Sequence, residues 1–152
     1  MEDRFKFKIV VYERDYEPKT DWEFAEIMED NNHWHLTMCG DIVKNNWNSA
    51  HYKRNNAPDN VCRVYEPIFC TGFKDKNGKL IYEGDIVKLQ CNREDKGGIF
   101  YQNAVVIYDI VDTFSGFSLS MKNDKYALWR SHKMEVIGNI WEDADLLKGG
   151  NE

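Results

Sequence analysis

The chain has 152 residues and a mass of 18.0 kDa, with 42% hydrophobic and 30% charged residues and a formal net charge of −6. A chain of this size buries roughly 70% of its surface on folding, so it can form a core without disulfides or metals. Its apolar runs are a few residues long, whereas roughly 20 are needed to cross a bilayer, and the N-terminus lacks the apolar segment of a secretion signal. These features exclude a membrane or secreted protein, and we expect a cytoplasmic one.

The first part of the sequence, residues 1–66, is predicted to be an N-terminal α+β appendage. Apolar and basic residues alternate near the start, which predicts a half-buried strand over 4–12. A second strand is expected over 33–39. The asparagine-rich stretch over 44–60 is expected to be irregular.

An acidic segment over residues 13–30 separates the first two predicted strands. It carries eight acidic and two basic residues, a local charge of −6, so the rest of the chain is neutral. Thr20 followed by Glu23 has the form of a capping box, and the apolar residues beyond it share one helical face, which predicts a short helix over 21–30. The segment is either a solvated face or a docking surface for a basic partner.

Residues 67–148 are predicted to form a small antiparallel β-barrel, followed by a tail over 149–152. Asn77-Gly78 favours a two-residue type I′ turn with positive φ at both positions. Gln102-Asn103 marks a predicted bend or bulge in a long strand. Several short strands with frequent turn signals favour a closed sheet. The strands are expected over 61–71, 86–91, 99–110, 117–121, 126–129 and 134–137, with a helical turn over 142–147.

Two separated motifs in this part resemble the YopX family of phage and prophage proteins. They are TGFKDKNGKLIYEGDIV over 71–87 and EVIGNIWE over 135–142, the latter followed by Asp145-Leu146-Leu147. Trp141 and Ala144 depart from the tyrosine-like and proline-like residues of the family ending. The resemblance implies an SH3-like β-barrel encoded in mobile elements, with no established biochemical activity, and we expect the protein to lie in the cytoplasm of a bacterial host. It supplies no catalytic residues.

The residues of both motifs are typical of scaffold positions. Gly84-Asp85 lets the chain enter the next strand sharply, and Asn77-Gly78 forms a turn. Leu146 and Leu147 are expected to lie back on the barrel. Nothing in the motifs pairs a nucleophile with a base, so we expect them to be structural.

The four cysteines form no CxxC pair and no disulfide framework that can be deduced, so we expect free thiols. The spacing of the histidines and cysteines fits no closed metal site well. We therefore expect no metal and no cofactor. If a zinc ion were bound, the first candidates would be His33, His35, Cys39, His51 and Cys62.

The preferred functional hypothesis is a non-catalytic module that binds an unidentified host or phage protein. It depends on the acidic segment and on aromatic residues in loops, because aromatic side chains are enriched at interface cores. Homo-oligomerisation stays open. The candidate binding residues are Asp21, Glu23, Glu26, Glu29, Trp47, Tyr52, Phe100 and Tyr101.

Two alternatives stay open. A nucleic-acid-binding barrel would use a basic strip over residues 74–96, but acidic residues leave this strip a net charge of only +1, so nucleic acid is disfavoured. A small enzyme is also disfavoured, because no nucleophile elbow, zinc-protease motif or phosphate-binding loop occurs. The strip consists of Lys74, Lys76, Lys79, Lys88, Arg93 and Lys96.

Overall fold

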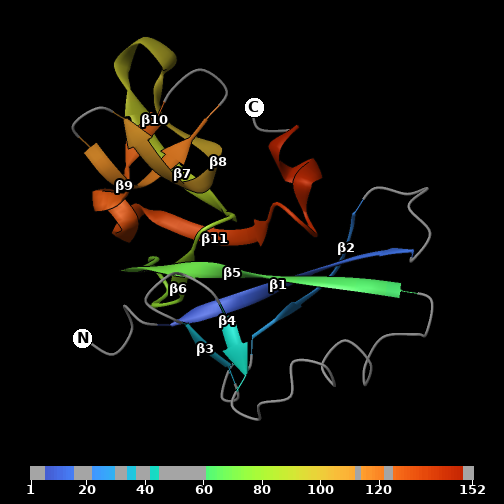
Figure 1. Cartoon of the computed structure of the whole chain (residues 1–152). Coiled ribbons are helices and arrows are strands. Elements are labelled where there is room, and N and C mark those ends of the chain that lie inside the picture. The colour runs from blue at the N-terminus through green and yellow to red at the C-terminus, as the bar shows by residue number, and fades with distance from the viewer. Residues whose placement is uncertain are drawn as a thin grey trace. The chain divides into compact units, whose positions relative to one another are not determined.

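The computed structural model describes a mainly β protein (Figure 1). The backbone is described for residues 6–15, 22–29, 34–36, 42–44, 61–111, 114–121 and 125–148, and no α-helix occurs in these ranges. The chain divides into an N-terminal unit, Phe7–Ile68, and a C-terminal unit, Met1–Lys6 with Phe69–Glu152. The division falls inside one long strand, β5 (Val61–Lys74). The predicted domain limit between residues 66 and 67 stays a prediction.

In the N-terminal unit, β1 (Phe7–Asp15) pairs antiparallel with β2 (Glu23–Met28) and lies next to β5 in the same sheet. β3 (Trp34–Leu36) and β4 (Ile42–Lys44) form a separate antiparallel pair. Alternate side chains of β1 point to one face, as strand geometry requires. The buried cluster on that face consists of Phe7, Ile9 and Val11, with Met28 of β2 packed against it.

The predicted helix over 21–30 is wrong, because Glu23–Met28 forms strand β2. Phe24, Ile27 and Met28 fit one helical face, but in the bulged strand Phe24 and Ile27 share one side and Met28 lies on the other. The register with β1 shifts at Ala25, since Val11 is opposite Glu26 while Tyr12 is opposite Phe24. Pairing with a distant strand therefore overrides the local capping signal.

The C-terminal unit contains a curled five-stranded antiparallel sheet in the order β10-β9-β8-β7-β11. β6 (Leu80–Tyr82) pairs with β5 in the other sheet. These two sheets agree with the expected small barrel-like fold. The remaining elements are β7 (Asp85–Arg93), η2 (Glu94–Lys96), β8 (Gly98–Val111), β9 (Phe114–Ser120), β10 (Lys125–Ala127), η3 (Leu128–Lys133), β11 (Met134–Asn139) and η4 (Ala144–Leu147).

The core of the C-terminal unit lies on the concave side of the curled sheet. Its side chains come from alternate positions of neighbouring strands, as in other small barrels. Burying one such side chain stabilises the fold by about 1.5–3 kcal/mol. The buried cluster consists of Ile81, Val87, Leu89, Ala104, Val106, Leu119, Leu128 and Met134.

Two predicted backbone details differ from the structure. The chain reverses at Asn77-Gly78, but the Gly78 N–H donates to the Asp75 carbonyl and the Asp75 N–H donates to that of Lys79. The loop therefore encloses three residues, with Gly78 in the left-handed region at φ 83°, and is not a two-residue turn. Of the bend or bulge expected at Gln102-Asn103, the bulge does not occur, because β7 and β8 pair without a register shift over their whole contact.

Candidate protein-binding surfaces

Asp75 organises the first motif through three hydrogen bonds. Its Oδ1 accepts the N–H groups of Asn77 and Lys79, each at 2.9 Å, and its Oδ2 accepts that of Val136 at 3.0 Å. Burial alone would raise the pKa of Asp75, but the N–H groups of Val136, Lys79 and Asn77, with the Lys79 charge, lower it below its ordinary value. This carboxylate joins the turn to β11.

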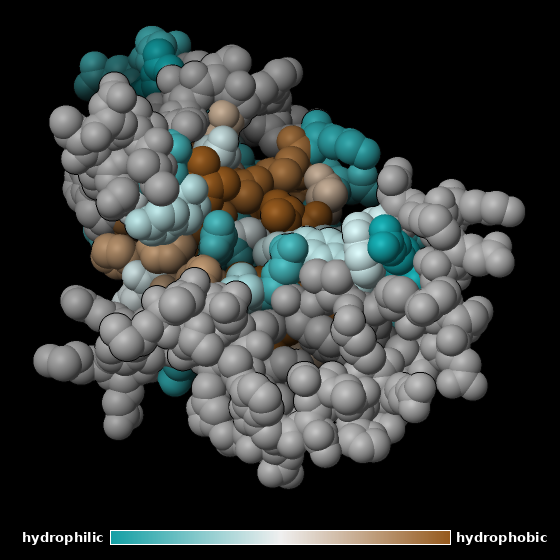
Figure 2. Space-filling model, viewed as in Figure 1, coloured by the Kyte–Doolittle hydropathy of each residue, from teal (hydrophilic) through white to brown (hydrophobic). Residues whose placement is uncertain are grey.

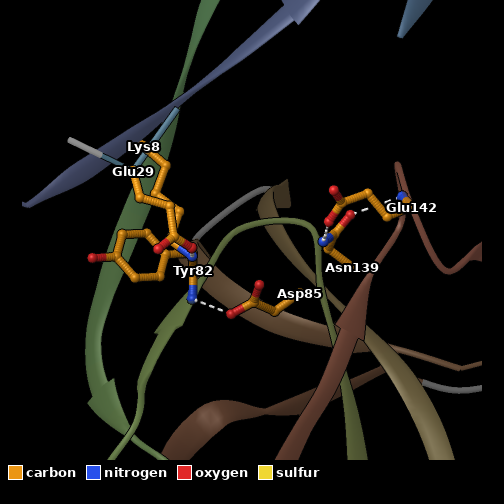
Figure 3. A network of polar contacts seen from close by, with 6 residues as sticks. All are labelled: Lys8, Glu29, Tyr82, Asp85, Asn139 and Glu142. Atoms are coloured by element: carbon orange, nitrogen blue, oxygen red, sulfur yellow. Dashed lines mark hydrogen bonds and ion pairs between the residues drawn. The ribbon is translucent and has the colours of Figure 1, made fainter. Parts of the chain in front are cut away.

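The turn between β6 and β7 is held in a similar way (Figure 3). The Tyr82 N–H donates to Oδ2 of Asp85 at 2.8 Å. Gly84 has φ 80°, and a Cβ at this position would overlap the Trp141 ring. Burial raises the pKa of the neighbouring Glu83, although a hydrogen bond from the Tyr108 N–H opposes this. Because φ at position 84 is positive and a Cβ would overlap the Trp141 ring, only glycine fits there without strain.

The second motif ends in a turn built on Asn139. Its Oδ1 accepts the N–H groups of Trp141 at 3.0 Å and Glu142 at 2.9 Å, and its Nδ2 donates to Oε2 of Glu142 at 2.7 Å (Figure 3). The Ile140 N–H donates to the Gly84 carbonyl at 2.9 Å. The two motifs are therefore hydrogen-bonded to each other, and their described residues stabilise the fold.

An exposed surface lies on the outer side of β8, opposite the core. Tyr101 is 48% exposed and Ile99 62% exposed, because they alternate with core-facing residues such as Ala104. The side chain of Asn103, on the same outer side, donates to the Leu146 carbonyl at 2.8 Å and holds η4 beside the strand. Figure 2 shows hydrophobic side chains where β8 and η4 meet. We call Ile99, Tyr101, Asn103, Leu146 and Leu147 the β8–η4 face.

Charged side chains next to Tyr101 are paired. The ammonium group of Lys88 lies 5.0 Å from the centre of the Tyr101 ring, an arrangement that favours a cation–π interaction. Lys76 forms a 2.6 Å ion pair with Glu135, and the hydrogen bond in this pair raises the pKa of Lys76. Apolar and aromatic groups beside polar groups are the usual composition of a protein interface.

The acidic segment is described in part, and it does not present its acids on one side. The register of β2 places Glu23 and Glu26 on the face that carries Val11. Glu29 lies on the opposite face, where it forms a 2.9 Å ion pair with Lys8 (Figure 3). The predicted surface is therefore divided between two faces of a strand.

The other predicted binding residues have different outcomes. Asp21, Trp47 and Tyr52 lie outside the described residues. Phe100 and Tyr101 are adjacent in a strand and point to opposite sides, so only Tyr101 belongs to the exposed face. Their roles in binding stay predictions.

Sequence reasoning missed part of the β8–η4 face. Leu146 and Leu147 were expected to lie back on the barrel; η4 does lie against β8 through the Asn103 hydrogen bond, and the two side chains are 37% and 38% exposed. Ile99 was not singled out, although it follows a diglycine that ends the η2 turn, with Gly98 at φ 102°. The position of this isoleucine directly after such a turn is the sequence signal that could have identified it as a candidate surface residue.

The side chains of the five candidate metal ligands lie outside the part of the chain that the structure describes. His33, Cys39 and His51 lie outside the described residues, and no side chain is described for His35 or Cys62. Within the described ranges, no group of three or more histidine, cysteine and acidic side chains could hold a metal ion. The same ranges contain no helix long and apolar enough to cross a membrane.

Comparison with protein families places the chain in a known one. The family described as YopX protein matches residues 19–148. This range is wider than the two motifs and includes β2 and the acidic strand residues. No curated protein matches the chain.

Proposed function

The chain belongs to the YopX family, and we propose that it acts as a non-catalytic module that binds a protein through the β8–η4 face. The observation that carries the proposal is the exposure of Tyr101 and Ile99, at 48% and 62%, on the strand whose Asn103 holds η4 and its exposed leucines. Large apolar side chains that gather on a surface with a polar rim are typical of interaction sites. The described motif residues form turns that stabilise the fold, so a binding role falls to residues outside the motif turns.

The proposed partner is a host or phage protein in the bacterial cytoplasm. The YopX resemblance supports this setting. A protein is favoured over nucleic acid because two bases of the basic strip are paired with acids: Lys76 with Glu135, and Arg93 with Asp95 at 2.6 Å. Phosphate binding depends on clustered basic side chains that neutralise phosphates and thereby release the counterions of the nucleic acid.

The proposal is tested by cross-linking and titration. A photoreactive amino acid in place of Tyr101 is used in the producing bacterium to capture the protein that contacts this face. The captured protein is then purified and titrated against the wild type and the double variant Ile99→Ser, Tyr101→Ser. We expect at least about a tenfold loss of affinity, because aromatic anchors dominate interface energies.

The matched control is Phe73→Ser. Phe73 is 41% exposed in the same unit but lies on β5, away from β8 in sequence and sheet order. It should leave the affinity unchanged. An equal loss in both variants, or unchanged affinity in the double variant, would contradict the proposal.

A further inference from the structure

The backbone of β2 stands at the end of its sheet. In the order β2-β1-β5-β6, it pairs on one side with β1, and no described strand pairs with its other side. The outward N–H and C=O groups of such a strand can pair with another chain. This edge belongs to the N-terminal unit and is separate from the β8–η4 face.

The bulge at Ala25 gives the two sides of β2 different chemistry. Glu23 and Glu26 lie on the first side, where Glu23 is directly opposite Glu13. Phe24 and Ile27 lie on the second side, and both are half-buried. Met28 also lies on the first side, where it packs against the buried cluster of β1, and Glu29, the residue after the strand, lies on the second side in its ion pair with Lys8.

We propose that this edge takes up an extended segment of a partner as an additional strand, and that this segment has basic residues on one side and apolar residues on the other. Basic side chains would lie against Glu23 and Glu26. Apolar side chains would cover Phe24 and Ile27. The proposal goes beyond the proposed function, because it concerns a second surface.

A second copy of this chain fits the edge poorly. The strand and its next residue carry Glu23, Glu26 and Glu29 and no basic residue, so two such edges would bring like charges together. Charged residues on an edge strand discourage self-pairing. The same charges attract a basic strand, so charge complementarity selects the occupant.

The test uses a labelled, end-blocked peptide of seven alternating valine and lysine residues, titrated against the full-length chain by fluorescence anisotropy. We expect binding, and slower hydrogen exchange of the β2 amides when the peptide is bound. The double variant Glu23→Gln, Glu26→Gln should weaken binding about twofold to thirtyfold, the range for two cross-strand charge pairs. The matched control, Glu94→Gln with Asp145→Asn, removes two exposed acids of the C-terminal unit and should bind as the wild type does.

Two control peptides separate strand addition from simple charge attraction. One has glutamate in place of lysine, and the other is methylated on its three central backbone amides. Both should bind at least about tenfold more weakly. Equal binding of the methylated peptide, or unchanged exchange of the β2 amides, would overturn the proposal, as would failure of the valine–lysine peptide to bind.

The β8–η4 face is tested separately in the same titration. The variant Ile99→Ser, Tyr101→Ser should bind the peptide as tightly as the wild type does. If it does not, the peptide binds at the other face and the strand-addition proposal fails. Failure of the proposed function would instead appear in the cross-linking experiment.

Discussion

Asp75 connects two distant parts of the chain through one carboxylate. Its two oxygens accept N–H groups from its own turn and from Val136 of β11. A buried N–H group without an acceptor is costly, because it has given up its hydrogen bond to water. An aspartate suits position 75 because its carboxylate accepts all three of these N–H groups.

We predict that Asp75→Asn lowers the free energy of unfolding at pH 7 by about 1–3 kcal/mol, because the amide cannot accept at both positions. The pKa of Asp75 is lowered from 3.8, so its stabilisation is complete above that value and is lost as pH falls through the folded-state pKa. Urea denaturation at pH 7 and at lower pH should therefore show a smaller acid-induced loss in the variant. Parallel losses in both proteins would contradict this role.

The turn between β6 and β7 depends on close packing as well as on backbone conformation. Gly84 and Gly78 have nearly the same φ, 80° and 83°, but they differ in their surroundings. A Cβ at Gly84 would meet the Trp141 ring, whereas a Cβ at Gly78 would meet nothing within 4 Å. The pair therefore separates backbone strain from steric overlap.

We predict that Gly78→Ala destabilises the protein by about 1 kcal/mol, the cost of positive φ for alanine. Gly84→Ala should cost about 2–4 kcal/mol, because overpacking adds to the same strain. In a Trp141→Ala background, the cost of Gly84→Ala should fall toward that of Gly78→Ala. Thermal denaturation of the four variants measures this, and equal costs at both glycines would refute the role of the ring.

The strands after residue 80 could be predicted well because turn residues separate them. Gly84-Asp85 stands at the start of β7 as expected, and Gly97-Gly98 stands in the same way at the start of β8. The element at 21–30 could not be predicted, because β1, which pairs with it, leaves no local sign in that segment. The position of the bulge could not be predicted for the same reason, because it depends on strand pairing. It lies at Ala25 and not at Gln102-Asn103.

The candidate site was predicted only in part. The diglycine indicated a loop near Tyr101, and the strand alternation then decided that this ring, rather than that of Phe100, points outward. The exposure of Leu146 depends on the short η4, which is held by a side chain of β8. Such a contact between residues 43 positions apart has no signature in local sequence.

At the scale of the whole molecule, the two units have separate buried clusters. One contains Ile9 and Val11 of β1, and the other contains Val87 and Met134 of the five-stranded sheet. β5 is the strand in which the division falls. Regions with separate cores commonly open with different free energies.

We predict that Gly84→Ala lowers the hydrogen-exchange protection of β7 and β11 more than that of β1. The substitution strains a turn of the C-terminal unit and removes nothing from the cluster of the N-terminal unit. Native-state exchange followed by mass spectrometry measures both regions in one sample. The same loss of protection in all three strands would show that the chain unfolds as one unit.

The hydrogen bond between Asp75 and Val136 has a consequence for synthesis of the chain. The two residues are 61 positions apart, so a ribosome adding roughly 5–20 residues per second makes the donor about 3–12 s after the acceptor. During that interval the Asp75 turn can form, but β11 is absent, and Met134 has not yet joined the core. A transcript that ends before codon 134 would therefore yield a chain with an open sheet edge at β7, which is a substrate for proteases and chaperones rather than a shorter working protein.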